Sequence, residues 1–197
     1  MSRLEPIDLA DVEGLEAVEE TYARTLGFVP NGLRIMARQP EIVKGFIALR
    51  HAVLDPSSGT VPTELKNLIA HIASKTAGCQ YSQAHSIQGA RNSGAEQARL
   101  EAIWEYPTSD LFSEAERAAL DLAVHAASVP NLVTDEDFER LRRHWDEGQI
   151  VEILAAISLY GFLNRWNDSL ATPLEDVSAE VADAALGAKG WSRGKHV

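Results

Sequence analysis

Hydrophobic residues recur at every third or fourth position through most of this chain, a spacing typical of amphipathic α-helices. No segment alternates apolar and polar residues between turn signals, as a half-buried strand would. The sequence therefore predicts an all-α fold. The expected helices span residues 8–25, 42–54, 62–76, 79–93, 95–104, 113–128, 149–170 and 178–186, with further helical pieces at 33–37 and from 134 onward.

The length of 197 residues suits one domain. Residues 55–60 form the clearest interior loop, but this loop is too short to be a linker between domains. We therefore expect residues 1–197 to form a single helical domain. In it, the helix within residues 1–29 packs on the core, and residues 188–197 form a flexible tail.

Composition and charge exclude several classes of function. The chain has 18 Lys and Arg against 29 Asp and Glu, a net charge of −11. This balance argues against binding to nucleic acid or to an anionic membrane surface. The most apolar segment, Ile150–Leu163, is too short to cross a bilayer, and the N-terminus lacks the pattern of a signal peptide. The single cysteine fits a reducing compartment, so a cytoplasmic location is expected.

Residues 64–85 contain the best candidates for chemistry. The only cysteine, Cys79, stands where a second helix begins, and Ser82 and His85 follow at spacings of three. These side chains therefore lie on neighbouring parts of one helical surface. The free N–H groups and the dipole at a helix N-terminus favour a thiolate. The pattern predicts a thiol site; the structural alternative is a buried cysteine, a capping serine and a surface histidine.

The preceding helix carries Glu64, Asn67 and His71 on one face. If the two helices pack antiparallel, some of these side chains approach Cys79 and His85 and form a proton relay. The alternative is structural, because an acidic residue in the first turn of a helix is favourable on its own.

A second polar cluster directly follows the apolar part of the long helix. Asn164, Asn167 and Asp168 share a face, and Arg165 is offset from it. Buried polar groups need partners, so this face is expected to hydrogen-bond to another helix, a subunit or a ligand. Bonding between helices is the favoured interpretation.

Motifs for metals and cofactors do not occur in the sequence. There is no His-Glu-x-x-His, no Cys-x-x-Cys, no glycine-rich phosphate loop and no Gly-x-Ser-x-Gly. The sequence therefore predicts no metal ligands and no cofactor.

Two separated motifs resemble a known family. Gly78-Cys79-x-Tyr81-Ser82 followed by His85, and later Leu159–Asp168, resemble the alkylhydroperoxidase AhpD and carboxymuconolactone decarboxylase superfamily, in its peroxidase-related branch. The resemblance implies an all-helical fold that assembles into homo-oligomers such as dimers, trimers or hexamers. It also implies a small-molecule substrate.

Active alkylhydroperoxidase-type members use a Cys-x-x-Cys pair, a later histidine and a glutamate on the preceding helix. The second cysteine attacks the peroxide and the first resolves it as a disulfide. Here Cys79 matches the first cysteine, but Ser82 stands at the attacking position and Asn67 at the place of the glutamate. The usual histidine position holds Ser86, with His85 one residue earlier.

Three hypotheses follow. The first is a peroxidase-related oxidoreductase with antioxidant activity, in which Cys79 is the oxidisable thiol, His85 its proton partner, and Asn67 or His71 lies behind them. The second is a non-thiol decarboxylase-like lyase, with His85 or His71 as general acid–base and Arg165 holding a carboxylate. The third is a non-catalytic oligomer that binds a small ligand. The expected substrate contacts are Tyr81, Asn164, Arg165 and Asp168.

Overall fold

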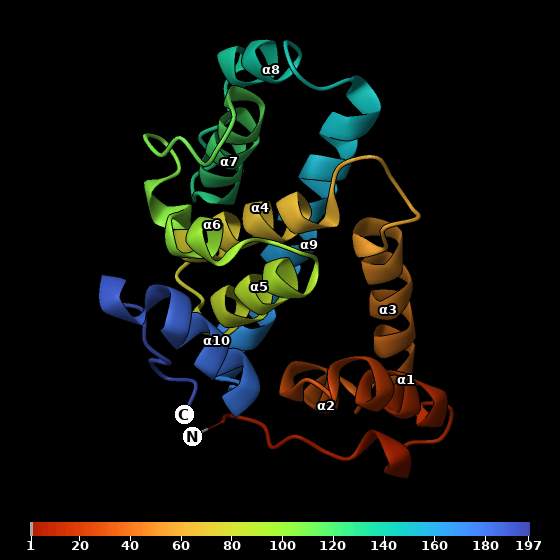
Figure 1. Ribbon diagram of the computed structural model, residues 1–197. Helices are drawn as coiled ribbons and strands as arrows, with labels where there is room; N and C mark the ends of the chain where they lie inside the picture. Colours follow the sequence, from red (N-terminus) through yellow and green to blue (C-terminus); the bar gives the residue numbers. More distant parts are fainter. Residues whose placement is uncertain (1) are drawn as a thin grey trace.

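A computed structural model describes residues 2–197 and confirms the all-α fold (Figure 1). The described residues form ten α-helices and three short 3-10 helices, without a strand. In chain order these are η1 (Leu9–Asp11), α1 (Glu16–Leu26), α2 (Asn31–Met36), α3 (Pro40–Leu54), α4 (Thr63–Thr76), α5 (Gln80–Asn92), α6 (Gln97–Glu101), η2 (Ile103–Glu105), α7 (Glu114–Ala127), α8 (Asp135–Leu141), α9 (Glu147–Leu170), α10 (Asp176–Leu186) and η3 (Gly187–Lys189).

Helix α4 lies at the centre of the main core, packed against α5, α7 and α9. The apolar side chains of α4 are buried there: Leu65, Leu68, Ile69 and Ile72. Capping boxes at Ser113, Thr134 and Asp146 start α7, α8 and α9. In each box the cap side chain accepts from the backbone N–H three residues later, and the side chain of that later residue accepts from the backbone N–H of the cap. In the part of the chain that the structure describes, no helix has both the length and the hydropathy to cross a membrane.

The N-terminal helices form a second apolar cluster beside this core. Leu15, Tyr22, Leu33 and Val43 of this cluster are buried, and Trp166 of α9 packs against them. The first helix starts later than the sequence predicts. Residues 8–25 are not one helix, because Gly14 adopts a φ of +82° and interrupts the run, so α1 begins at Glu16.

The C-terminal segment is packed, although the sequence predicts a flexible tail there. Trp191 is 7% exposed and His196 is fully buried. The carbonyl of His196 accepts a hydrogen bond from the backbone N–H of Leu174 at 3.0 Å. This bond ties the end of the chain to the connection between α9 and α10, and the backbone N–H of Arg3 donates to the carbonyl of Leu170 nearby at 2.9 Å.

Candidate functional site

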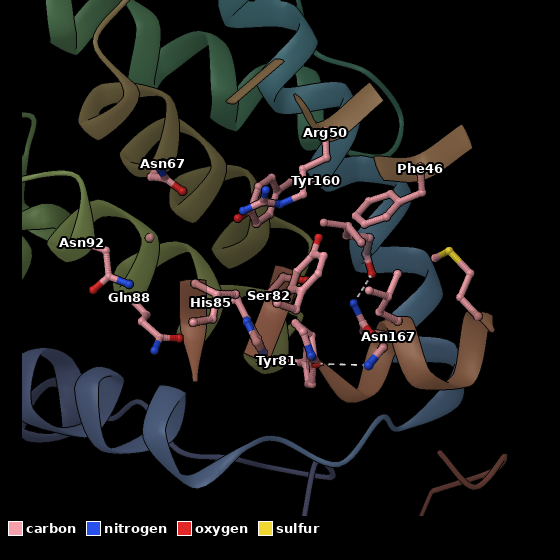
Figure 2. Close-up of a pocket in the computed structure, with 18 residues that line it drawn as sticks. Phe46, Arg50, Asn67, Tyr81, Ser82, His85, Gln88, Asn92, Tyr160 and Asn167 are labelled. Atoms are coloured by element: carbon pink, nitrogen blue, oxygen red, sulfur yellow. Dashed lines mark hydrogen bonds between the residues drawn. The ribbon is translucent and has the colours of Figure 1, made fainter. Parts of the chain in front are cut away.

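A cavity of about 110 Å³ lies between the N-terminal helices and the α5–α9 part of the core (Figure 2). Its wall combines aromatic and aliphatic side chains with a few polar groups, the composition expected of a small-molecule site. The lining residues are Tyr22, Leu26, Pro30, Gly32, Leu33, Met36, Phe46, Arg50, Asn67, Tyr81, Ser82, His85, Gln88, Gly89, Asn92, Tyr160, Leu163 and Asn167.

One guanidinium group and no ammonium group lines this cavity among the described residues. Arg50 of α3 reaches over the ring of Tyr22, with its guanidinium carbon 5.9 Å from the ring centroid. Tyr160 of α9 is also part of the wall, and burial raises the pKa of its hydroxyl to about 12. Tyr160 therefore stays a neutral hydrogen-bonding group at physiological pH, and Arg50 supplies positive charge for an anion.

Two glycines allow the helices around the cavity to approach closely. A Cβ on Gly32 would lie 2.5 Å from Oδ1 of Asn167, and a Cβ on Gly89 would lie 2.3 Å from Oδ1 of Asn67. Both distances are shorter than a van der Waals contact permits. The two amide side chains therefore occupy space that any larger residue at 32 or 89 would take, and Asn67 lies on the cavity wall.

The polar centre of the site is formed by His85, Tyr81 and Glu175. Nε2 of His85 lies 2.7 Å from Oε2 of Glu175, and the Tyr81 hydroxyl donates to Oε1 of the same carboxylate at 3.0 Å. The rings of Tyr81 and His85 stack with centroids 4.4 Å apart. The backbone N–H groups of Asn31 and Gly32 donate to Glu175 and to the Tyr81 oxygen, respectively. Three distant segments thus meet at one carboxylate.

Burial and neighbouring charges set the protonation states of Glu175 and Tyr81. Burial favours a higher pKa for Glu175, but the contacts with His85 and the N–H of Asn31 outweigh it, and the pKa of the carboxyl is lowered. Burial and the neighbouring carboxylate raise the pKa of Tyr81 well above its usual range. Glu175 is therefore the ionised acceptor, and Tyr81 is a neutral donor. Glu175 engages Nε2 of His85, which leaves Nδ1 as the ring nitrogen without a hydrogen bond to this carboxylate.

Cys79 and His85 are not brought together as the thiol-site hypothesis expects. Cys79 is the N-cap of α5, and its thiol donates to Oγ of Ser82 at 3.3 Å. The cysteine is fully buried and does not line the cavity, whereas Ser82 and His85 do. Burial raises the pKa of the Cys79 thiol, so the thiolate that the helix N-terminus was expected to favour is disfavoured.

His71 lies behind the cavity in a closed hydrogen-bond network. Its Nδ1 is 3.1 Å from the carbonyl of Gln83, and Nε2 accepts from the indole N–H of Trp104 at 2.9 Å. The carbonyl can only accept, so Nδ1 carries the proton and the ring is neutral. Burial lowers the pKa of His71 to about 3. Glu64, on the same helix, is paired with Arg99 at 2.9 Å.

We expect His71 to make the folded protein acid-sensitive. Its pKa falls from 6.5 to about 3 in the fold, so between these pH values the unfolded chain binds more protons. The contribution of neutral His71 to the free energy of unfolding is complete above pH 6.5 and is lost as the pH falls towards 3. The free energy of unfolding then changes by at most about 1.4 kcal/mol per pH unit. Urea unfolding at a series of pH values should show a shallower pH dependence in His71→Gln than in the wild type. An identical slope, with His144→Gln as the surface control, would contradict this role.

The substrate contacts expected from the late polar cluster lie elsewhere. Asn164, Arg165 and Asp168 line a separate surface groove of about 700 Å³, and Arg165 donates to the carbonyl of Gly161 at 3.0 Å. Asn167, the remaining polar residue of that cluster, lines the cavity instead. Tyr81, by contrast, lies on the cavity wall as expected of a substrate contact.

Comparison with known proteins identifies the family. A profile of the carboxymuconolactone decarboxylase family matches residues 40–125, from α3 into α7. The crystal structure of the debrominase Bmp8 superposes with a TM-score of 0.85 and 34% sequence identity, covering 92% of this chain and 97% of that one. The chain therefore belongs to the carboxymuconolactone decarboxylase family.

Further relatives share the fold. A cysteine-to-alanine variant of Bmp8 in complex with 2,3,4-tribromopyrrole has a TM-score of 0.84 at 34% identity, over 91% of this chain and 95% of that one. A peroxidase-related protein from Ralstonia eutropha JMP134 has a TM-score of 0.79 at 22% identity, over 90% and 94% of the two chains, which supports the fold alone. The uncharacterized protein YdfG of Bacillus subtilis is 27% identical over 139 residues, 70% of this chain and 84% of YdfG.

Two residues of the site had no signal in the sequence. Glu175 stands before a weakly patterned helix, where a carboxylate is favourable without any distant partner. Arg50 is one of several charged residues on an amphipathic helix and has the pattern of a solvent-exposed side chain. Glu175 reaches His85 from the connection between α9 and α10, and Arg50 reaches the cavity wall from α3, so only the tertiary fold brings either residue to the site.

Proposed function

We propose that this protein is a non-thiol enzyme that transfers a proton to or from a carbon atom of a small unsaturated carboxylate or lactone. His85 is the general acid–base. The observation that carries the proposal is the 2.7 Å contact between Nε2 of His85 and Glu175 at the wall of an aromatic cavity. A carboxylate on one ring nitrogen orients an imidazole and stabilises its protonated form while the other nitrogen exchanges a proton.

The remaining groups divide the work of binding and polarisation. Arg50 holds the carboxylate of the substrate, because a guanidinium binds a carboxylate through two parallel hydrogen bonds. The side-chain amide of Asn67 hydrogen-bonds to a substrate oxygen that gains negative charge during the reaction. In a decarboxylation, the electron pair of the broken carbon–carbon bond passes into the conjugated system, carbon dioxide leaves, and His85 delivers a proton to carbon.

The size of the cavity limits the substrate to a single small ring at most. Its volume of about 110 Å³ is below the roughly 150 Å³ of an apolar cavity that admits benzene. A monocyclic ligand therefore fits only with small movements of the wall. The relatives support the same size class, since one family is named for a lactone decarboxylation and Bmp8 binds a tribromopyrrole.

The thiol-dependent alternatives have less support. A thiol peroxidase needs a nucleophilic sulfur at the substrate. A reductive debrominase, which replaces bromine by hydrogen, needs a two-electron donor at the same place. Cys79 is fully buried and does not line the cavity, and Ser82 cannot supply such electrons. A non-catalytic ligand-binding protein would need no acid–base group, whereas this cavity holds His85 paired with a carboxylate.

The test is proton exchange at carbon. We would incubate the protein in D₂O with a panel of unsaturated lactones, including carboxymuconolactone, and small oxo acids, and follow deuterium incorporation and carbon dioxide release by NMR. The proposal expects at least one member of the panel to exchange or decarboxylate faster with the protein than in buffer alone. The rate should fall in both variants, and less in Tyr81→Phe than in His85→Gln. No turnover of any member would reject it.

We expect no thiol peroxidase activity from Cys79. The rate of peroxide consumption with a thiol reductant should be the same for the wild type and Cys79→Ser, because the sulfur is buried and its pKa is raised. A peroxide assay with hydrogen peroxide and an organic hydroperoxide measures this. A wild-type rate clearly above that of Cys79→Ser would restore the peroxidase hypothesis.

A further inference from the structure

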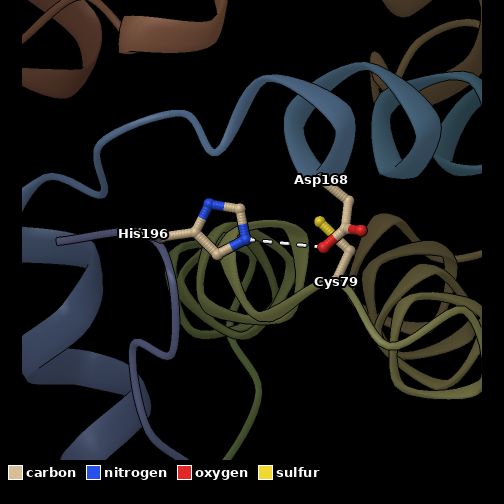
Figure 3. A group of neighbouring side chains, drawn as sticks. All are labelled: Cys79, Asp168 and His196. Atoms are coloured by element: carbon tan, nitrogen blue, oxygen red, sulfur yellow. Dashed lines mark ion pairs between the residues drawn. The ribbon is translucent and has the colours of Figure 1, made fainter. Parts of the chain in front are cut away.

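Three potential metal ligands from distant parts of the chain meet at one point next to the cavity wall, where the Cys79 thiol donates to Ser82 (Figure 3). Cys79 is the N-cap of α5, Asp168 lies in the last turn of α9, and His196 belongs to the C-terminal segment. One ligand atom from each lies within 4.8 Å of the other two. None of the three lines the cavity described above, so they form a separate cluster.

His196 points a ring nitrogen without a hydrogen bond into this cluster, where its one contact among the described residues is the 3.7 Å approach to Asp168 (Figure 3). The side chain is fully buried, and Nδ1 lies 2.8 Å from the backbone carbonyl of Thr172. A carbonyl only accepts, so Nδ1 carries the proton and Nε2 presents a lone pair. Metal-binding histidines commonly have this arrangement, in which the second ring nitrogen donates to a carbonyl and fixes the orientation of the ring.

The atom that faces Nε2 is also an acceptor. Oδ1 of Asp168 lies 3.7 Å from Nε2, and neither atom has a hydrogen-bond partner among the described residues. Buried polar atoms without partners are costly, and two facing lone pairs are satisfied together by a cation between them. The other carboxylate oxygen accepts from Nζ of Lys195 at 2.7 Å, which leaves Oδ1 directed at the cluster.

We propose that Cys79, Asp168 and His196 bind a divalent metal ion of the zinc type. A thiolate, an imidazole and a carboxylate form a donor set that suits Zn²⁺. Ideal bond lengths of about 2.0–2.3 Å require the ligand atoms to lie roughly 3.5 Å apart, so the three side chains close in by about 1 Å on binding. The Cys79 thiol releases its proton to solvent, and the two negative ligands then balance the charge of the ion.

The surroundings offer a route and a fourth position for the ion. Asp168 lines the surface groove that also contains Asn164 and Arg165. An ion can enter from that groove, and a water molecule on the same side completes a tetrahedral site. Because His196 is near the end of the described chain, the ion would join the C-terminal segment to α5 and α9.

The first experiment uses Zn²⁺ and Co²⁺ alone as probes on the purified full-length chain. We expect one Zn²⁺ per chain, and Co²⁺ should give a thiolate-to-cobalt charge-transfer band with the strong visible bands of a tetrahedral site. His196→Asn should weaken Zn²⁺ binding by at least about 100-fold, the upper range for loss of an outer-sphere partner. The asparagine amide can still donate to Thr172 but provides no second nitrogen, so the segment keeps its hydrogen bond.

The controls separate this site from adventitious binding. Cys79→Ser should abolish the charge-transfer band, while His144→Asn, at an exposed histidine, should bind like the wild type. Zn²⁺ should raise the midpoint of thermal unfolding of the wild type but not of His196→Asn. Equal Zn²⁺ affinity in the wild type and His196→Asn, or a cobalt spectrum without a thiolate band, would overturn the proposal. Circular dichroism of each variant checks that it is folded.

Discussion

Replacing His85 with glutamine should lower the rate of proton exchange at carbon by a factor of about 10² to 10⁴, the usual contribution of a general acid–base group. Glutamine is similar in length and can still donate to the carboxylate of Glu175, which now lies 2.7 Å from Nε2. It cannot accept and return a proton. The rate in D₂O under saturating substrate, followed by NMR, measures the effect.

Two further variants make this result specific. Glu175→Gln should retain part of the activity, because a neutral amide still orients the imidazole but brings no negative charge to the proton that the ring gains during the reaction. His144→Gln, at an exposed histidine, should react like the wild type. An unchanged rate in folded His85→Gln would refute His85 as the acid–base group, whichever substrate is turned over.

Replacing Glu152 with alanine should destabilise the fold by about 3 kcal/mol, because it leaves a buried ammonium without its counter-ion. Lys66 of α4 is only 2% exposed, and its Nζ lies 2.8 Å from the Glu152 carboxylate. The same carboxylate accepts the backbone N–H groups of Thr60 at 2.9 Å and Val61 at 3.0 Å. The free energy of unfolding in urea measures the loss.

The double variant Lys66→Met with Glu152→Gln should recover most of this stability, since methionine fills the space without a charge and glutamine still accepts the loop N–H groups. Glu41→Ala breaks an exposed ion pair with Lys44 and should have little effect. If Glu152→Ala were no less stable than Glu41→Ala, the buried pair would have no role in stability.

Much of the fold was predictable because its signals are local. The capping residues Ser113 and Thr134 start helices wherever they precede an acidic residue and an apolar run, and both do so here. The error at the N-terminus has a backbone cause. The apolar residues on both sides of Gly14 keep the spacing of a helix. Only the positive φ of Gly14 shows that the helix does not continue through it.

The site was predictable only where one helix carries it. Tyr81, Ser82 and His85 lie on α5, so a short motif brings all three to the cavity. Glu175 comes from a connection far along the chain, and no periodicity relates it to His85. The cluster of Cys79, Asp168 and His196 was missed for the same reason, because spacing rules for metal sites describe ligands close in sequence. The homo-oligomeric state and the cytoplasmic location remain predictions.

The partner of His85 lies outside the stretch that matches the family profile. That stretch, residues 40–125, contains His85 and Arg50 but neither Glu175 nor Tyr160. Two members can therefore have the same residues throughout the shared segment and still differ in the group that hydrogen-bonds to the histidine. Grouping these proteins by the shared segment alone would combine members with different reactions. Asking whether a carboxylate from the last third of the chain reaches the histidine would separate them.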